Sequence, residues 1–177
     1  NISFILRPGD KTALIGQNDI QTTALIRAIM GEIDYEGTVK WGVTTSRSYL
    51  PKDNSADFAG SESILDWLRQ FASKEEDDNT FLRGFLGRML FSGDEVNKPV
   101  NVLSGGEKVR VMLSKLMLLK SNVLVLDDPT NHLDLESISS LNDGLKNFKE
   151  SIIFASHDHE FIQTLAKDRK STRLNSS

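Results

Sequence analysis

The chain has 177 residues, a length that fits one domain with a hydrophobic core of its own. Its net charge of -4 gives no electrostatic sign of nucleic-acid binding, and its lack of cysteine excludes disulfides and thiolate metal sites. Because no apolar run approaches the roughly 18 residues of a membrane span and no signal peptide is visible, we expect a soluble, cytoplasmic protein.

Two short strands are expected at the start of the chain, over residues 1–6 and 11–15. Between them, Arg7-Pro8-Gly9-Asp10 forms a turn, because Pro and Gly stand where a turn favours them. A helix is predicted from Thr23 to Met30, so residues 16–23 form a loop between a strand and a helix. A phosphate-binding loop occupies that position in many nucleotide-binding proteins.

Residues 16–23 read Gly-Gln-Asn-Asp-Ile-Gln-Thr-Thr and match the pattern G-x-x-x-x-G-K-[ST] only in part. The pattern supplies backbone N–H groups for phosphate, a lysine for the β- and γ-phosphates and a hydroxyl for Mg²⁺. Gln21 replaces its second glycine and Thr22 replaces its lysine. The missing lysine forfeits a contact worth roughly 1.5–3 kcal/mol, so nucleotide binding should be weak or altered. The residues expected to contact phosphate are Gly16, Asn18, Thr22 and Thr23.

The middle of the chain is predicted to be mainly helical. Two strands come first, one over residues 39–41 and one that ends before Tyr49. Apolar residues at helical spacing then predict amphipathic helices over 62–71 and 81–91, joined by an acidic loop over 73–80. We expect the apolar stripes of these helices to pack in a core.

The run Leu103-Ser104-Gly105-Gly106-Glu107 begins a further helix. Ser104 is a good N-cap, and Glu107 three residues later completes a capping box. A capping box alone does not explain two consecutive glycines, each of which weakens a first helical turn by roughly 1 kcal/mol relative to alanine. Glycines at this position let another backbone approach closely, and helix N-termini bind phosphates.

A buried strand is predicted over Val123–Asp127, and a second carboxylate, Asp128, follows it directly. Carboxylates at the C-terminal end of a parallel strand lie where α/β sheets bind their ligands. After a helix through residues 138–145, a second buried strand is predicted over Ser151–Ala155, and His157 follows it. A lone histidine after a strand is often structural, but its place behind a second buried strand favours a functional role.

Three segments together resemble an ATP-binding cassette. Leu103–Glu107 resembles the signature motif, Val123–Asp127 the Walker B strand, and Pro129-Thr130-Asn131-His132-Leu133-Asp134 the D-loop. The D-loop run is most similar to the ABC-F group, whose members carry two cassettes in tandem and act on ribosomes. The resemblance implies an α/β, P-loop NTPase-like fold with a largely parallel sheet, an antiparallel β edge and a helical subdomain over about residues 60–118.

The resemblance also implies roles for the residues already singled out. In the resembled mechanism two cassettes enclose two ATP molecules, and each site takes its signature from the opposite cassette. Thr23 and Asp127 would bind Mg²⁺, and Asp128 would polarise the attacking water where the family has glutamate. His157 would contact the γ-phosphate. The residues that would bind the partner's ATP are Ser104, Gly105, Gly106 and Glu107.

Two departures from the family pattern concern charge. Asp19 stands where the family usually has glycine, and Lys52 stands in the Q-loop where the family has glutamine. Lys52 is either an ordinary solvated lysine or a cation that restores part of the charge lost at Thr22. We therefore expect an ABC-type ATPase whose own half-site is impaired. The alternatives are a non-catalytic nucleotide-sensing cassette and the ATPase subunit of a membrane transporter, which the D-loop run disfavours.

The expected partners are a second cassette, in the same full-length chain or in a second copy of this one, and the ribosome, with no membrane. No aromatic residue that would stack on adenine precedes Asn1, and residues 168–177 have almost no apolar content. We therefore expect a cassette domain over residues 1–167 that is truncated at both ends, followed by a non-native or disordered tail.

Overall fold

The computed structural model describes residues 2–166 and 171–173. By its internal contacts the chain divides into two compact units. The first, which we call the sheet unit, contains residues 1–52, 121–129 and 148–177. The second, which we call the helical unit, contains residues 53–120 and 130–147.

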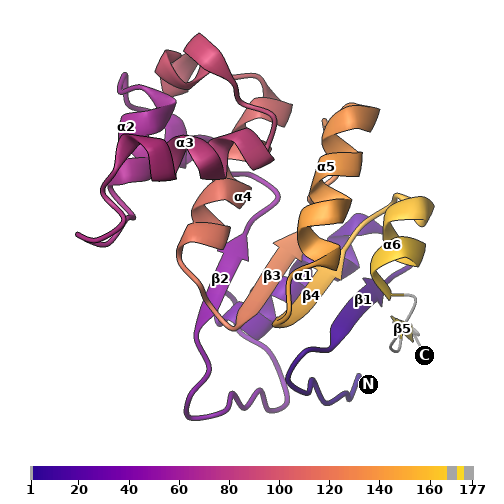
Figure 1. Ribbon diagram of the computed structural model, residues 1–177. Helices are drawn as coiled ribbons and strands as arrows, with labels where there is room; N and C mark the ends of the chain where they lie inside the picture. Colours follow the sequence, from indigo (N-terminus) through magenta and orange to yellow (C-terminus); the bar gives the residue numbers. More distant parts are fainter. Residues whose placement is uncertain (1, 167–170, 174–177) are drawn as a thin grey trace. The chain divides into compact units, whose positions relative to one another are not determined.

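The described part of the sheet unit contains a five-stranded, fully parallel sheet with the strand order β2-β3-β4-β1-β5 (Figure 1). Its strands are β1 Lys11–Ile15, β2 Arg47–Leu50, β3 Val123–Asp127, β4 Ser151–Ala155 and β5 Ser171–Arg173. Every residue of β3 and β4 is buried, because continuous apolar runs suit strands that are covered on both faces. Asp127 lies opposite Ala155, so these two strands end together at one edge of the sheet.

Two helices, α1 (Asp19–Met30) and α6 (His159–Ala166), belong to the sheet unit (Figure 1). The side chains of Ile26 and Ile29 on α1 pack against apolar side chains of the strands. The buried residues of this core are Leu14, Ile26, Ile29, Val123, Val125, Ile153 and Ala155. This packing holds α1 against the sheet, so both ends of the loop between β1 and α1 are anchored.

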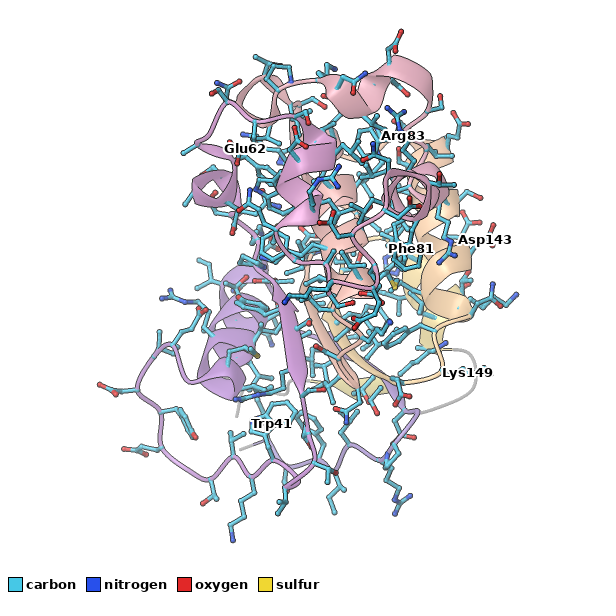
Figure 2. The ribbon with its side chains drawn as sticks, turned by 60° about the vertical axis from the view of Figure 1, so that its left-hand side comes forward. Trp41, Glu62, Phe81, Arg83, Asp143 and Lys149 are labelled. Atoms are coloured by element: carbon cyan, nitrogen blue, oxygen red, sulfur yellow. The ribbon has the colours of Figure 1, made fainter. Side chains whose placement is uncertain are left out.

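The helical unit contains α2 (Ile64–Arg69), α3 (Asn79–Arg88), α4 (Gly105–Leu118) and α5 (Leu135–Lys146). Short 3-10 helices cover Ser55–Phe58, Gly93–Asn97 and Val100–Val102. Figure 2 labels Phe81 and Arg83, two exposed residues of α3, and the Arg83 guanidinium donates to the Gly93 carbonyl at 3.0 Å. The buried face of α3, which carries Leu82 and Leu86, packs with α2 and α4 as the amphipathic pattern predicts.

The α/β fold with a parallel sheet and a helical subdomain is confirmed, and β3 and β4 are neighbours with the predicted bounds. The antiparallel edge is wrong, because neither residues 2–6 nor 39–41 form a strand. Their apolar side chains, Phe4, Leu6 and Trp41 (Trp41 is labelled in Figure 2), are partly buried against the sheet-unit core instead. Packing of these side chains, without a ladder of backbone hydrogen bonds, accounts for the apolar pattern that suggested strands.

The expected tail divides into two parts. Residues 171–173 form β5, which pairs in parallel with β1 from Ser171 opposite Ala13 to Arg173 opposite Ile15. The backbone of this segment completes an edge of the sheet, and the expectation of a non-native or disordered tail over residues 168–177 stays a prediction. The other residues of the predicted tail, 168–170 and 174–177, lie outside the described residues.

Candidate functional site

A cavity of about 330 Å³ lies in the sheet unit beyond the carboxyl ends of the parallel strands. Parallel sheets bind ligands at this edge, because the loops that follow the strands meet there. Seven of the predicted site residues line the cavity: Gly16, Thr22, Thr23, Lys52, Asp127, Asp128 and His157. Asp19, which the sequence analysis noted only as an added negative charge, lines it as well.

The loop between β1 and α1 uses several of its own polar groups. Helix α1 begins at Asp19, four residues before the predicted start, because Asn18 is an extended N-cap residue whose side chain accepts from the Gln21 N–H at 3.0 Å. The Gln21 side-chain oxygen accepts in turn from the Gln17 N–H at 3.3 Å. Thr22 occupies the lysine position of the phosphate-loop pattern. It is buried, and its hydroxyl donates a hydrogen bond to the Asp19 carbonyl at 3.0 Å.

The carboxylate of Asp19 pairs with two groups from other segments. Its Oδ2 is 2.8 Å from the Lys52 Nζ, and its Oδ1 is in contact with the His157 Nε2. The hydrogen bond from Lys52 is the main cause that holds the pKa of Asp19 below its usual value, and the same bond raises the pKa of Lys52. Lys52 thus forms an ion pair within the site, and its contribution to nucleotide binding stays a prediction.

Asp127 is the buried carboxylate of the site. The residue is 2 % exposed, and burial is the main cause that raises the pKa of its carboxyl, although a hydrogen bond from Thr23 acts in the opposite direction. Its Oδ2 is buried and has no hydrogen-bond partner among the described residues. A buried carboxylate oxygen without a partner, beside a threonine hydroxyl, suits a hard divalent cation such as Mg²⁺, which prefers oxygen ligands.

Asp128 follows the end of β3 in a strained conformation. Its φ is +52°, which is uncommon for a residue other than glycine, and its N–H donates to the Ala155 carbonyl at 2.9 Å. Its Oδ2 lies 3.9 Å from the Lys52 Nζ. Asp19, Asp128 and His157 each offer one ligand atom, and these atoms lie within 4.8 Å of one another, but the Lys52 ammonium already pairs with both carboxylates.

The predicted signature residues lie in the helical unit, at the start of α4. The capping box is confirmed, since Ser104 accepts from the Glu107 N–H at 3.2 Å and Glu107 accepts from the Ser104 N–H at 2.7 Å. Lys98 pairs with Glu107 at 2.6 Å. A Cβ added to Gly106 would lie 2.8 Å from the His132 carbonyl oxygen, so Gly106 allows a close approach of the D-loop backbone.

Sequence reasoning named seven of the fifteen residues that line the cavity and missed the pairing of Asp19. The available signal was Asn18, a favourable N-cap residue, because it marks Asp19 as the first helical residue and a carboxylate there is close to whatever the loop binds. Asn18, by contrast, acts as the N-cap of α1, and it is not among the residues that line the cavity.

In this parallel sheet, a loop leads from a strand into a helix N-terminus, and a buried carboxylate lies beside a threonine and further polar groups at the carboxyl ends of the strands. This is the arrangement of a P-loop type nucleotide-binding domain. Among the described residues, no helix has both the length and the apolar character required to cross a membrane.

Comparison with known proteins identifies the family. The family model described as ABC transporter matches residues 1–131, and the chain belongs to this family. The chain is 58% identical over 168 residues to the ABC transporter ATP-binding protein YkpA of Bacillus subtilis (strain 168), covering 94% of this chain and 31% of that protein. It is 34% identical over 174 residues to the ATP-binding protein Uup of Caulobacter vibrioides, covering 94% of this chain and 28% of that protein.

These relatives are of the ABC-F type, and the chain is an ATP-binding cassette of that type. The chain spans about a third of the length of the relatives that it matches. A solved structure of RNase-L Inhibitor has the same fold, with a TM-score of 0.79, 21% identity, and coverage of 97% of this chain and 33% of that chain. The structure of an archaeal ribosome recycling factor, aABCE1, in complex with the ribosomal stalk protein aP1 is also similar. Its TM-score is 0.80, with 20% identity and coverage of 97% of this chain and 33% of that chain.

Proposed function

We propose that this chain binds Mg-ATP in the cavity of the sheet unit and forms a composite ATPase site with a second cassette. The observation that carries the proposal is the convergence of Thr23, Asp127, Asp128 and His157 at the carboxyl edge of one parallel sheet. ABC-F membership supports ATP as the nucleotide.

Thr23 and Asp127 are the residues that would hold Mg²⁺. The Thr23 hydroxyl already hydrogen-bonds to Asp127, and the second oxygen of Asp127 is buried without a partner among the described residues. Bound Mg²⁺ would supply charge neutralisation for the phosphates and keep their oxygens in place. Asp127 would gain a partner for its buried charge at the same time.

Asp128 would orient the attacking water from the residue that follows β3. Phosphoryl transfer to water depends mainly on positioning and charge stabilisation, so the reach of this side chain matters. An aspartate is one methylene shorter than the glutamate of the family pattern, and a base displaced by an ångström can cost about a hundredfold in rate. Its ion pair with Lys52 further restrains the Asp128 carboxylate. Hydrolysis in this half-site should therefore be slow.

The residues at the start of α4 would serve the nucleotide of the second cassette. Ser104, Gly105, Gly106 and Glu107 stand at a helix N-terminus whose backbone N–H groups and dipole favour an anion. The second cassette would be part of the full-length protein or a second copy of this chain. One chain would thus contribute an intact signature to its partner while its own phosphate loop is degraded.

The full-length protein would act in the cytoplasm on the ribosome. The support for this is the ABC-F type of the relatives. The ribosome contacts would depend on parts of the protein beyond the third that this chain covers.

A second candidate function is a nucleotide-sensing cassette that binds ATP without hydrolysing it. The specific observation in its favour is that the residue in the lysine position, Thr22, is buried and bonded to the Asp19 carbonyl. Binding through the remaining groups would leave the γ-phosphate without the usual lysine contact. Single-turnover hydrolysis in the presence of a second cassette with a competent signature separates the two functions.

A titration of labelled ATP with Mg²⁺ tests the proposed site. It compares the chain with a variant that carries Asp19→Gly, Gln21→Gly and Thr22→Lys, which rebuilds the phosphate-loop pattern. We expect at least tenfold tighter binding to the variant, because a charge-assisted contact is regained. Equal affinities would contradict the placement of phosphate at this loop.

A further inference from the structure

The Asp19 carboxylate lies between a lysine and a histidine that come from two other segments of the sheet unit. One carboxylate oxygen pairs with the Lys52 Nζ at 2.8 Å, and the other contacts the His157 Nε2. Lys52 follows β2 and His157 follows β4, so the anion is held by groups from two strands of the sheet. A phosphate group bound in this cavity would place two of its oxygens against the same two side chains, Lys52 and His157.

The loop also bonds two of its own backbone N–H groups to its own side chains. The Gln17 N–H donates to the Gln21 Oε1 at 3.3 Å, and the Gln21 N–H donates to the Asn18 Oδ1 at 3.0 Å. Backbone N–H groups of such a loop are the usual ligands of phosphate. Oxygen atoms of the protein itself therefore accept hydrogen bonds from both the backbone N–H groups and the side-chain donors of the site.

We propose that Asp19 is an affinity-determining residue that competes with the nucleotide phosphate for Lys52 and His157. The proposal rests on the proposed function, since it concerns the same cavity. The helix N-terminus at Asp19 favours an anion at this position, and the carboxylate supplies one from within the chain. A nucleotide must displace the carboxylate before its phosphate reaches the two partners.

The weakness of the site then has two separable causes. The first is the missing lysine at Thr22, which removes a cation. The second is that the cation which is present, Lys52, is paired with Asp19. Simple repulsion between Asp19 and phosphate would also weaken binding, but it would not depend on Lys52. That difference makes the proposal testable.

The test measures the affinity for Mg-ATP of the chain and of Asp19→Asn, by isothermal titration calorimetry. Asp19→Asn keeps the size of the side chain and removes its charge. We expect about fivefold tighter binding, which is about 1 kcal/mol and is the upper range for release of an exposed ion pair. The matched control is Asp34→Asn, which removes an exposed carboxylate of the same unit away from the cavity and should leave the affinity within about 1.5-fold.

A double-mutant cycle with Lys52→Gln separates competition from repulsion. If Asp19 acts by holding Lys52, the gain from Asp19→Asn should fall to about twofold in the Lys52→Gln background, with His157 as the remaining partner. The same gain in both backgrounds, or no gain beyond that of Asp34→Asn, overturns the proposal.

The outcome is distinct from a failure of the proposed function. If the variant with the rebuilt phosphate loop binds Mg-ATP and Asp19→Asn gives no gain, only the competition proposal fails. If neither variant binds Mg-ATP, the cavity is not a nucleotide site and both proposals fail. Circular dichroism of each variant confirms that the chain remains folded.

Discussion

The predicted phosphate loop of the sheet unit and the predicted signature of the helical unit each lead into a helix with a capped N-terminus, but they differ in which residues follow the cap. Asn18 caps α1 and Ser104 caps α4, each with a side-chain oxygen that accepts a backbone N–H. In the first turn of α1 a carboxylate follows the cap, and it pairs with Lys52 and His157. In the first turn of α4 two glycines follow the cap instead.

The difference shows that a capped helix N-terminus is not necessarily available to bind an anion. The loop before α1 keeps the strand-loop-helix arrangement of the family, although side chains of the chain itself use several of its donors. The signature keeps its glycines, and at Gly106 the space is used by the His132 carbonyl. Four substitutions test this contrast, in order of decreasing expected effect.

The largest effect is expected for Gly106→Ala in the helical unit. The added Cβ would lie 2.8 Å from the His132 carbonyl oxygen, and His132 is already in a strained conformation with φ +66°, so the D-loop backbone must shift. We expect a loss of about 2 kcal/mol in the free energy of unfolding, measured with urea. Gly105→Ala is the matched control, because its nearest contact is at 3.4 Å and alanine favours a helix. Equal losses from the two substitutions would contradict the close approach.

The next effect concerns the buried charge of Asp127 in the sheet unit. Because burial raises its pKa, ionised Asp127 destabilises the fold above that pKa, and the penalty disappears as the pH falls below the unfolded pKa. Asp127→Asn should therefore stabilise the nucleotide-free chain by about 1 kcal/mol near pH 7, and the advantage should shrink toward about pH 4. Urea unfolding as a function of pH measures this, with Asp34→Asn as control. An advantage that grows on acidification would show that the sign is wrong.

An effect of about the same size is expected for Lys52. If it supplies part of the cationic charge that Thr22 lacks, Lys52→Gln should weaken Mg-ATP binding about fivefold in the chain and less than twofold once Thr22→Lys is present. The non-additivity is the measured quantity in a double-mutant cycle. Effects that add within about 0.5 kcal/mol would mean that the two positions act independently.

The smallest effect is expected at the capping box of α4. Burial acts to raise the pKa of Glu107, but the Lys98 ammonium and the Ser104 N–H outweigh it and lower that pKa, so the pair stabilises the fold above the unfolded pKa of Glu107. Lys98→Gln should cost about 0.5 kcal/mol at pH 7, and the cost should disappear below the folded pKa and in high salt. Lys74→Gln, at an exposed position of the same unit, should cost nothing measurable. A cost for Lys98→Gln that survives at low pH would point to lost packing of its side-chain stem.

Continuous apolar strands and capped helices were predictable because their signals are local. Val123–Asp127 and Ser151–Ala155 have the expected bounds, since each is a short apolar run buried on both faces. The expected strand over residues 39–41 failed because Trp41 is partly buried against the core without a strand partner. Apolar content alone does not distinguish a side chain that packs from a backbone that pairs.

The candidate site was predictable to the extent that it follows the carboxyl ends of strands. The positions of Asp127 and Asp128 could be predicted in this way, whereas the pairing of Asp19 with Lys52 and His157 could not. That pairing joins residues far apart in the chain, and it depends on which strands lie next to each other. Because α1 starts at Asp19, the carboxylate lies at the carboxyl ends of the strands. The predicted helix start at Thr23 left Asp19 in a loop, where its side chain could not be placed.

The proposed site binds nucleotide phosphate in the sheet unit at a loop that the chain's own carboxylate partly occupies. An NMR titration of the ¹⁵N-labelled chain with Mg-ATP tests it most directly, because each amide reports separately. We expect the largest shift changes at Gly16–Thr23, Asp128 and His157, with the His157 ring nitrogen shifting in Asp19→Asn before any nucleotide is added. Changes confined to Ser104–Glu107, or a His157 ring that is unaffected by Asp19→Asn, would contradict the claim.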